Sequence, residues 1–157
     1  NTSTVANYIQ VLGEAELLGG LHMYAPDVVR QYQSIPKFQV YNSALQTVFH
    51  SSTFQDVYTN PTWWGRRVES AVGADLGICA VDEDYKVFYW RERNDEMDFV
   101  MVRGERVLGI EVKSGHRSAG NGLRAFQNRF PHAQTLVVGT GGLPLDIFFF
   151  SIFTPTF

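Results

Sequence analysis

The sequence predicts an α/β fold in which a mixed sheet is flanked by helices. Three observations lead to this prediction: a helical stretch spans residues 62–81, three short β-type segments follow it within residues 86–113, and a second helix and a fourth strand come after them. The predicted order of elements is therefore α-β-β-β-α-β. A chain of 157 residues with 45% hydrophobic content can bury the core of one ordinary domain and carry an appendage.

The first 35 residues, 1–35, are expected to be that appendage, a helix followed by the remnant of a wing. Apolar side chains recur at helical spacing within residues 4–18, and Gly19-Gly20 is expected to end this helix before a short strand at residues 21–24. The same pattern would also suit a packing hairpin. Because the chain opens at Asn1 and not at a methionine, we expect a fragment that enters within a domain.

The main domain is expected to span residues 36–157, with its core at residues 61–141. It begins with a strand and a short helix, at residues 38–41 and 44–49. A polar stretch at residues 50–61 then separates these elements from the core helix. Three glycines weaken that helix, and we expect them to allow close packing against a sheet.

Three strands follow the core helix, at residues 86–91, 97–103 and 107–113. A second helix at residues 118–130 is ended by Pro131, and the fourth strand occupies residues 135–139. The aromatic tail at residues 148–153 is expected to be a strand or an exposed terminus that seeks a partner. It is too short to span a bilayer.

The second and third strands are predicted to form a hairpin that brings two acids together. A two-residue turn within residues 103–106 would place Arg103 opposite Arg106, and the same register then sets Asp98 opposite Glu111. Their Cβ atoms would lie roughly 5 Å apart. Because side chains alternate along a strand, Lys113 falls on the same face as Glu111.

Two carboxylates this close repel each other unless a cation lies between them. Mg²⁺ takes oxygen ligands and commonly binds through one or two carboxylates and substrate phosphates. A nearby lysine can orient the attacking water and stabilise charge on a phosphate. Asp98, Glu111 and Lys113 are therefore predicted to form a site for phosphodiester hydrolysis. In the alternative interpretation, Glu111 and Lys113 are an outward polar face or a cross-strand ion pair.

These residues resemble the PD-(D/E)xK, or restriction-endonuclease-like, superfamily, whose signature is an acid on one strand and acid-x-Lys on the next. Met97 stands where the superfamily name has proline. Further segments are similar to the uncharacterised C-terminal domain of prokaryotic AAA-family ATPases, and the similarity extends over nearly the whole chain. They are residues 36–41, 65–69, 89–91, 96–99, 110–115 and 136–139.

The resemblance implies a restriction-endonuclease-like core preceded by a partial winged-helix-like segment. It implies that Asp98, Glu111 and Glu69 hold Mg²⁺ or Mn²⁺, and that these three acids and Lys113 are the catalytic residues. It also implies an AAA ATPase domain, N-terminal to this sequence on the same polypeptide. Since the sequence lacks a GxxxxGK[ST] loop, ATP would be bound only in that N-terminal part.

Nucleic acid is the expected partner. Residues 112–132 contain four basic residues, two histidines and no acid, a local surplus that suits phosphates or a merely solvated basic face. The net charge of −3 excludes a protein that coats nucleic acid wholesale. Candidates for contact with the substrate lie in and after the turn that follows the third strand. They are His116, Arg117, Arg124 and Gln127.

The single cysteine, Cys79, excludes an intramolecular disulfide. No signal peptide or long apolar run is visible, so we expect a soluble, cytoplasmic protein without a membrane span. An oligomer is compatible with the sequence. The alternative function is a non-catalytic nuclease-fold module that docks on or regulates the ATPase or binds a protein partner, for example through the Phe-rich tail.

Overall fold

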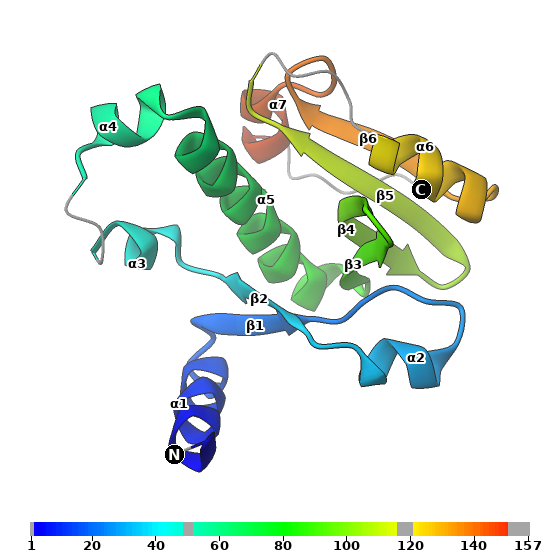
Figure 1. Ribbon diagram of the computed structural model, residues 1–157, viewed down its shortest axis with the longest axis horizontal. Coiled ribbons are helices and arrows are strands. Elements are labelled where there is room, and N and C mark those ends of the chain that lie inside the picture. Colours follow the sequence, from blue (N-terminus) through cyan, green and yellow to red (C-terminus); the bar gives the residue numbers. More distant parts are fainter. Residues whose placement is uncertain (1, 49–51, 116–120, 151–157) are drawn as a thin grey trace.

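The computed structural model describes residues 2–48, 52–115 and 121–150 (Figure 1). Its helices and strands, in chain order, are α1 (Thr2–Glu14), β1 (Leu18–Leu21), α2 (Val28–Gln33), β2 (Lys37–Val40), α3 (Ser43–Val48), α4 (Phe54–Thr59), α5 (Pro61–Glu83), β3 (Lys86–Glu92), β4 (Asp95–Arg103), β5 (Arg106–Lys113), α6 (Asn121–Arg129), β6 (Gln134–Gly139) and α7 (Leu145–Phe150). No helix in these described ranges is long and apolar enough to cross a membrane.

A four-stranded mixed sheet, in the order β3-β4-β5-β6, forms the centre of the fold. The pairs β3–β4 and β4–β5 are antiparallel, whereas β5 and β6 are parallel. A parallel pair needs a crossover connection, and α6 lies within it. The predicted α/β class and the order α-β-β-β-α-β, here α5-β3-β4-β5-α6-β6, are confirmed (Figure 1).

Two separate hydrophobic clusters lie between the sheet and its helices, one at α5 and one at α6. Val72 and Leu76 of α5 pack with buried residues of β4 and β5, among them Phe99. Phe126 of α6 packs with Trp90 and other residues in the second cluster. The predicted close approach at the α5 glycines is confirmed, because a Cβ atom at Gly73 would lie 2.6 Å from Cζ of Phe99.

A β-bulge interrupts β4 at Asp98 and Phe99. Phe88 pairs with Val100 and Trp90 pairs with Met97, so these two residues of β4 lie against the single residue between Phe88 and Trp90 on β3. The bulge shifts the alternation of side chains: Met97 and Val100 both pack in the α6 cluster, while Phe99 packs in the α5 cluster. Because a bulge bends its strand and redirects side chains, Asp98 lies at a kink.

A second, two-stranded sheet joins β1 and β2 in antiparallel register. The buried Gln39 of β2 donates a hydrogen bond to the carbonyl oxygen of Ser70 on α5 at 2.8 Å. Beyond β1, Met23 forms a parallel bridge with Tyr89. The two-stranded sheet therefore joins the N-terminal segment, through β1, to the main domain, through β2. The two parts also meet at aromatic side chains, where the ring of Tyr24 lies 5.0 Å from that of Phe130.

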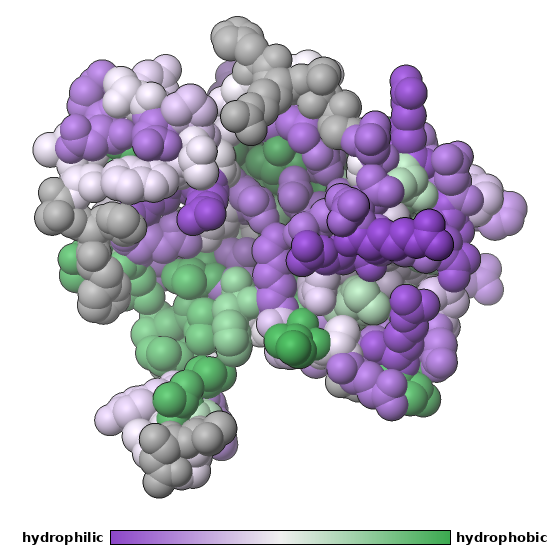
Figure 2. All heavy atoms as spheres, in the orientation of Figure 1, coloured by the Kyte–Doolittle hydropathy of each residue, from purple (hydrophilic) through white to green (hydrophobic). Residues whose placement is uncertain are grey.

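The first helix was expected to reach residue 18 but ends at Glu14. The strand expected at residues 21–24 is β1, which begins earlier, at Leu18. Helix α1 stops at Glu14, and Glu16 adopts a positive φ of 55° in the turn that follows. Gly19 is not a helix breaker: it lies in β1, where the ring of Tyr41 packs so closely that a Cβ atom would lie 2.1 Å from its hydroxyl oxygen. Figure 2 shows hydrophobic surface around the junction of α1 and β1. On α1, Val11 is 60% exposed.

Two predictions about the chain's polar and aromatic stretches were wrong in whole or in part. The stretch expected to be a polar separator contains α4, because Thr53 and Asp56 form a capping box that starts a helix. The described part of the aromatic tail is a helix, α7, and not a strand, although its last residue, Phe150, is 89% exposed, as the alternative of an exposed end expects. Its Phe148 is fully buried against the α5 side of the sheet.

Candidate functional site

The predicted hairpin register between β4 and β5 is confirmed for the five pairs nearest the turn, but the ladder ends before the predicted pair of Asp98 and Glu111. Arg103 pairs with Arg106, and the ladder continues to Phe99 opposite Ile110. Gly104 takes a positive φ of 58° in the two-residue turn, a conformation that glycine adopts without steric cost. Beyond the last pair, the contact between the strands is made by a side chain and not by the backbone of β4. Oδ2 of Asp98 accepts a hydrogen bond from the backbone N–H of Val112 at 2.8 Å.

Asp98 has the most perturbed carboxyl group at this site. Burial, as the largest cause, and the charges of Glu69 and Glu111 raise the pKa of Asp98, while the N–H of Val112 and the charge of Lys37 lower it, and the net result is a rise from 3.8 to about 7. The three carboxylates predicted from the sequence are therefore close enough to influence one another. Without an added cation, Asp98 is only partly ionised near neutral pH.

Glu111, on β5, lies beside Asp98 of β4 and is 7% exposed. Its Oε1 atom forms an ion pair with the ammonium of Lys113 on the same strand, and not the cross-strand pair of the alternative interpretation. The Lys113 side chain is 19% exposed. Lys113 thus contacts a buried carboxylate and also reaches the protein surface.

Glu69, on α5, is held by a lysine that the sequence did not single out. Nζ of Lys37, the first residue of β2, lies 2.7 Å from Oε1 of Glu69 and 3.3 Å from Oε1 of Glu96. Burial alone would lower the pKa of Lys37, but the hydrogen bond and charge of Glu69, with the charges of Glu96 and Asp98, raise it above its ordinary value. The only signal in the sequence was its place in the segment at residues 36–41, because its partners are 32 and 59 residues away along the chain.

The donor set fits a cation held by two carboxylates better than one held by three. Within the part of the chain that the structure describes, no three His, Cys, Asp or Glu side chains are grouped so that they could hold a metal ion. Glu69 is paired with Lys37 and Glu111 with Lys113, so a cation held by Asp98 and Glu111 would take the place of the Lys113 ammonium at Glu111. Two carboxylates completed by water and phosphate oxygens are a usual environment for Mg²⁺.

Of the four predicted substrate residues, the structure describes two, and these lie on α6, apart from the elements that carry the acids. His116 and Arg117 lie outside the described residues. Arg124 and Gln127 are exposed on α6, and Nε2 of Gln127 donates a hydrogen bond to Oγ1 of Thr135 on β6 at 2.9 Å. Gln127 therefore ties α6 to β6.

A groove of about 790 Å³ opens beside Lys113. It lies between the end of β5 and the N-terminal part of α5, with α4 at its side. Its described lining residues are Tyr58, Pro61, Thr62, Trp64, Gly65, Val112, Lys113, Ser114 and Gly115. Sequence reasoning missed the contribution of α4, because that segment was expected to be a separator.

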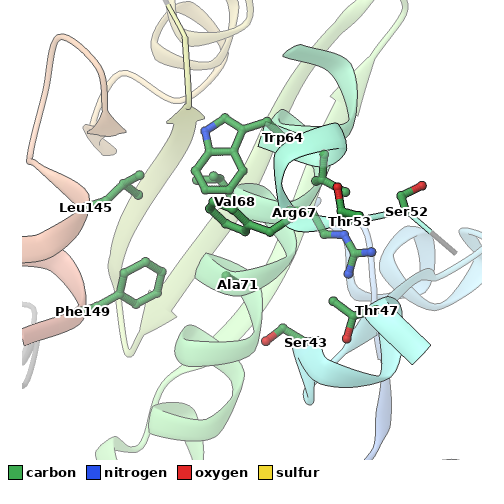
Figure 3. A pocket seen from close by; sticks show the side chains of 12 residues that line it. Ser43, Thr47, Ser52, Thr53, Trp64, Arg67, Val68, Ala71, Leu145 and Phe149 are labelled. Carbon is green, nitrogen blue, oxygen red and sulfur yellow. The ribbon is translucent and has the colours of Figure 1, made fainter. Parts of the chain in front are cut away.

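A second pocket, of about 450 Å³, lies on another side of Trp64 and contains none of the acids (Figure 3). Figure 3 shows Leu145 and Phe149 of α7 facing Ala71 of α5 across it. Arg67 is the positively charged residue among its described lining residues, and its guanidinium is held by the backbone: Nη2 donates a hydrogen bond to the carbonyl oxygen of Gln46 at 2.7 Å. This pocket is largely apolar and offers no acid–base chemistry.

Comparison with known proteins gives one match. The sequence model of a family described as "Domain of unknown function (DUF4143)" matches residues 64–151, more than half of the chain. The matched range contains Glu69, Asp98, Glu111 and Lys113. No curated protein and no solved structure matches the chain.

Proposed function

The chain belongs to the DUF4143 family, a domain of unknown function, and we propose that it is a nuclease-like domain that hydrolyses phosphodiester bonds of nucleic acid with Mg²⁺ or Mn²⁺. The observation that supports this most is Asp98, a carboxyl group set at a β-bulge beside the buried Glu111, with its pKa raised to about 7. A strongly perturbed acid next to a second acid and a lysine is typical of a functional site. The proposal includes a restriction-endonuclease-like core and an AAA ATPase domain on the same polypeptide.

In this proposal Asp98 and Glu111 hold the cation. When bound, the cation would activate a water molecule and stabilise negative charge on the phosphate. Its charge would also favour the ionised form of Asp98, which burial and the neighbouring acids now oppose.

Lys113 is placed to act on the substrate. It pairs with Glu111 and also lines the groove, so a small rotation of its side chain carries the ammonium from the carboxylate toward a phosphate in the groove. There it would orient the attacking water and stabilise charge on the phosphate oxygens. Glu69 is a positioning residue, since it reaches Asp98 through its charge and is itself fixed by Lys37.

A second function is favoured by the two lysine pairs. Glu69 is paired with Lys37 and Glu111 with Lys113, so only Asp98 among the three acids is left without a cationic partner in an ion pair of the described residues. Such a network can hold β2 against α5 without any chemistry. A non-catalytic module that docks on the ATPase or on another protein would need nothing more.

Calorimetric titration with Mn²⁺ at pH 8 separates the two functions. The wild-type chain is compared with an Asp98→Asn, Glu111→Gln variant and with a matched control, Asp95→Asn, Glu105→Gln, which removes the same two charges elsewhere on the hairpin. Saturable binding that is lost in the first variant and kept in the control supports the metal site. Absent binding, or equal binding by all three proteins, contradicts it and favours the non-catalytic module.

A further inference from the structure

The groove beside Lys113 has one wall that comes from the candidate site itself. Val112 and Lys113 end β5, and Ser114 follows them into the groove. The opposite wall is the first turns of α5, which approach so closely at Gly65 that a Cβ atom there would lie 3.4 Å from Oγ of Ser114. Whatever lies in this groove is therefore in reach of the Lys113 ammonium.

The side of the groove is aromatic and open to solvent. Tyr58 of α4 is 54% exposed, and its ring lies 5.1 Å from that of Trp64 at an interplanar angle of 75°. Phe54 stacks against Tyr58, with 5.7 Å between ring centroids and 15° between planes. Tyr58 and the half-buried Trp64 thus form a small aromatic platform in the lining that includes Lys113, and Phe54 supports Tyr58 from the side of the second pocket.

The platform is fixed to the fold. Thr53 and Asp56 cap the start of α4, and at its end the N–H of Asn60 donates to the carbonyl oxygen of Val57. The same Asn60 caps α5 through its side chain, which accepts hydrogen bonds from the N–H groups of Thr62 and Trp63. Aromatic rings held this way can bind a flat ligand at little cost in conformational entropy.

The charge of the groove suits an anionic chain. Its described lining residues include Lys113 and no acid. Arg66 is exposed and lies one helical turn after Thr62, on the same face of α5. The acids Asp98 and Glu111 lie beyond Lys113, where the proposed cation would offset their charge.

We propose that this groove binds single-stranded nucleic acid, with bases stacked on Tyr58 and Trp64 and the backbone phosphates toward Lys113. The proposal rests on the proposed function, because it names the substrate class of the same site. Bases in a duplex are stacked on each other and offer no free faces, whereas unpaired bases stack readily on aromatic side chains. A duplex would have to be held by phosphate contacts alone, for which a chain of net charge −3 is poorly suited.

The test is fluorescence anisotropy with a labelled oligothymidylate and with a labelled duplex of the same length, in the presence of Mg²⁺. All proteins carry Asp98→Asn, so that the probes are not cut. We expect tighter binding of the single strand, a loss of affinity of about tenfold or more in Tyr58→Ala, and near-normal affinity in Tyr58→Phe, which keeps the ring. Tyr8→Ala, which removes a tyrosine of α1 that is 67% exposed, is expected to have no effect.

Equal affinity for single strand and duplex, or unchanged single-strand binding in a folded Tyr58→Ala protein, would overturn the proposal. If Tyr58→Ala loses its native circular dichroism, Tyr58→Leu takes its place, because leucine keeps the apolar contact with Trp64 but cannot stack. Failure here is distinct from failure of the nuclease proposal. If the wild type cuts duplexes and its binding does not depend on Tyr58, only this inference is removed. If single-strand binding depends on Tyr58 but the wild type cuts nothing, only the proposed function is removed.

Discussion

The carboxylate of Asp98 accepts a hydrogen bond from the backbone N–H of Val112, 2.8 Å away, at the point where the ladder between β4 and β5 stops. The bond stabilises the ionised form of Asp98, but burial and two neighbouring acids outweigh it and raise the pKa of Asp98 to about 7. Asp98 is therefore sensitive both to pH and to any cation that approaches it.

Asp98→Asn is expected to stabilise the protein at pH 8 and to have little effect near pH 4. The carboxyl loses its proton near pH 4 in the unfolded chain and only near pH 7 in the folded one. Between these values the folded state binds more protons, so the free energy of unfolding of the wild type falls as pH rises. The gain in the variant at pH 8 is at most about 4 kcal/mol, measured by urea unfolding. Equal differences at both pH values would contradict the raised pKa, and Asp95→Asn is the control.

Lys37→Met and Glu69→Gln are expected to move the pKa of Asp98 in opposite directions. The charge of Lys37 lowers this pKa and the charge of Glu69 raises it. The lysine variant should therefore have a higher pKa at Asp98 than the wild type, and the glutamate variant a lower one. Titration of the side-chain carboxyl by carbon-13 NMR measures both. Glu83→Gln, at the far end of the same helix, should leave the value unchanged, and a shift of the same sign in both site variants would refute the arrangement.

Lys113→Met is expected to reduce cleavage without loss of metal binding. If Lys113 stabilises charge on the phosphate, its removal should lower the rate by about 10²-fold or more. The affinity for Mn²⁺ should stay the same or rise, since the ammonium no longer competes for Glu111. Cleavage assays and calorimetry on the same preparation test the two parts. Lys86→Met, an exposed lysine at the start of β3, serves as the control; retained cleavage in Lys113→Met would exclude the role.

Gly122→Ala is expected to destabilise the fold, and Gly13→Ala to stabilise it slightly. A Cβ atom at Gly122 would lie 2.1 Å from the carbonyl oxygen of Glu96, a backbone atom of β4 that cannot move aside. The cost should be about 3 kcal/mol. At Gly13 on α1 the nearest atom would be 3.6 Å away, so the better helix propensity of alanine should add about 0.5 kcal/mol. Thermal unfolding of both variants gives the sign, and equal effects would contradict the close approach of α6 to β4.

Local patterns in the sequence were sufficient for much of the fold. The hairpin register followed from a two-residue turn and the apolar runs beside it, and it was correct to the last pair, Phe99 with Ile110. The order of helices and strands from α5 to β6 also followed from periodicity. These features depend on residues close together in the chain, where spacing determines geometry.

The features that the sequence did not predict depend on contacts between residues far apart in the chain or on a one-residue shift in the alternation of side chains along a strand. Lys37 approaches Glu69 only because β2 is anchored on α5 through Gln39, a relation that no local spacing encodes. Helix α7 was missed because a run of phenylalanines has neither helical nor strand periodicity, and burial of Phe148 decides its conformation. The bulge adds one residue to β4 without any glycine or proline to mark it.

That extra residue has a consequence for how the chain can change. Deleting Phe99 would make the ladder with β3 regular and leave Met97 and Val100 on the α6 side, but the single residue between them would then be Asp98, in the place where the Phe99 ring packs in the α5 cluster. A substitution at the same positions alters one side chain and leaves the rest in place. The bulge therefore allows β4 to carry both the buried Phe99 ring and the Asp98 carboxyl between the same two neighbours, and a one-residue deletion there is expected to remove one or the other.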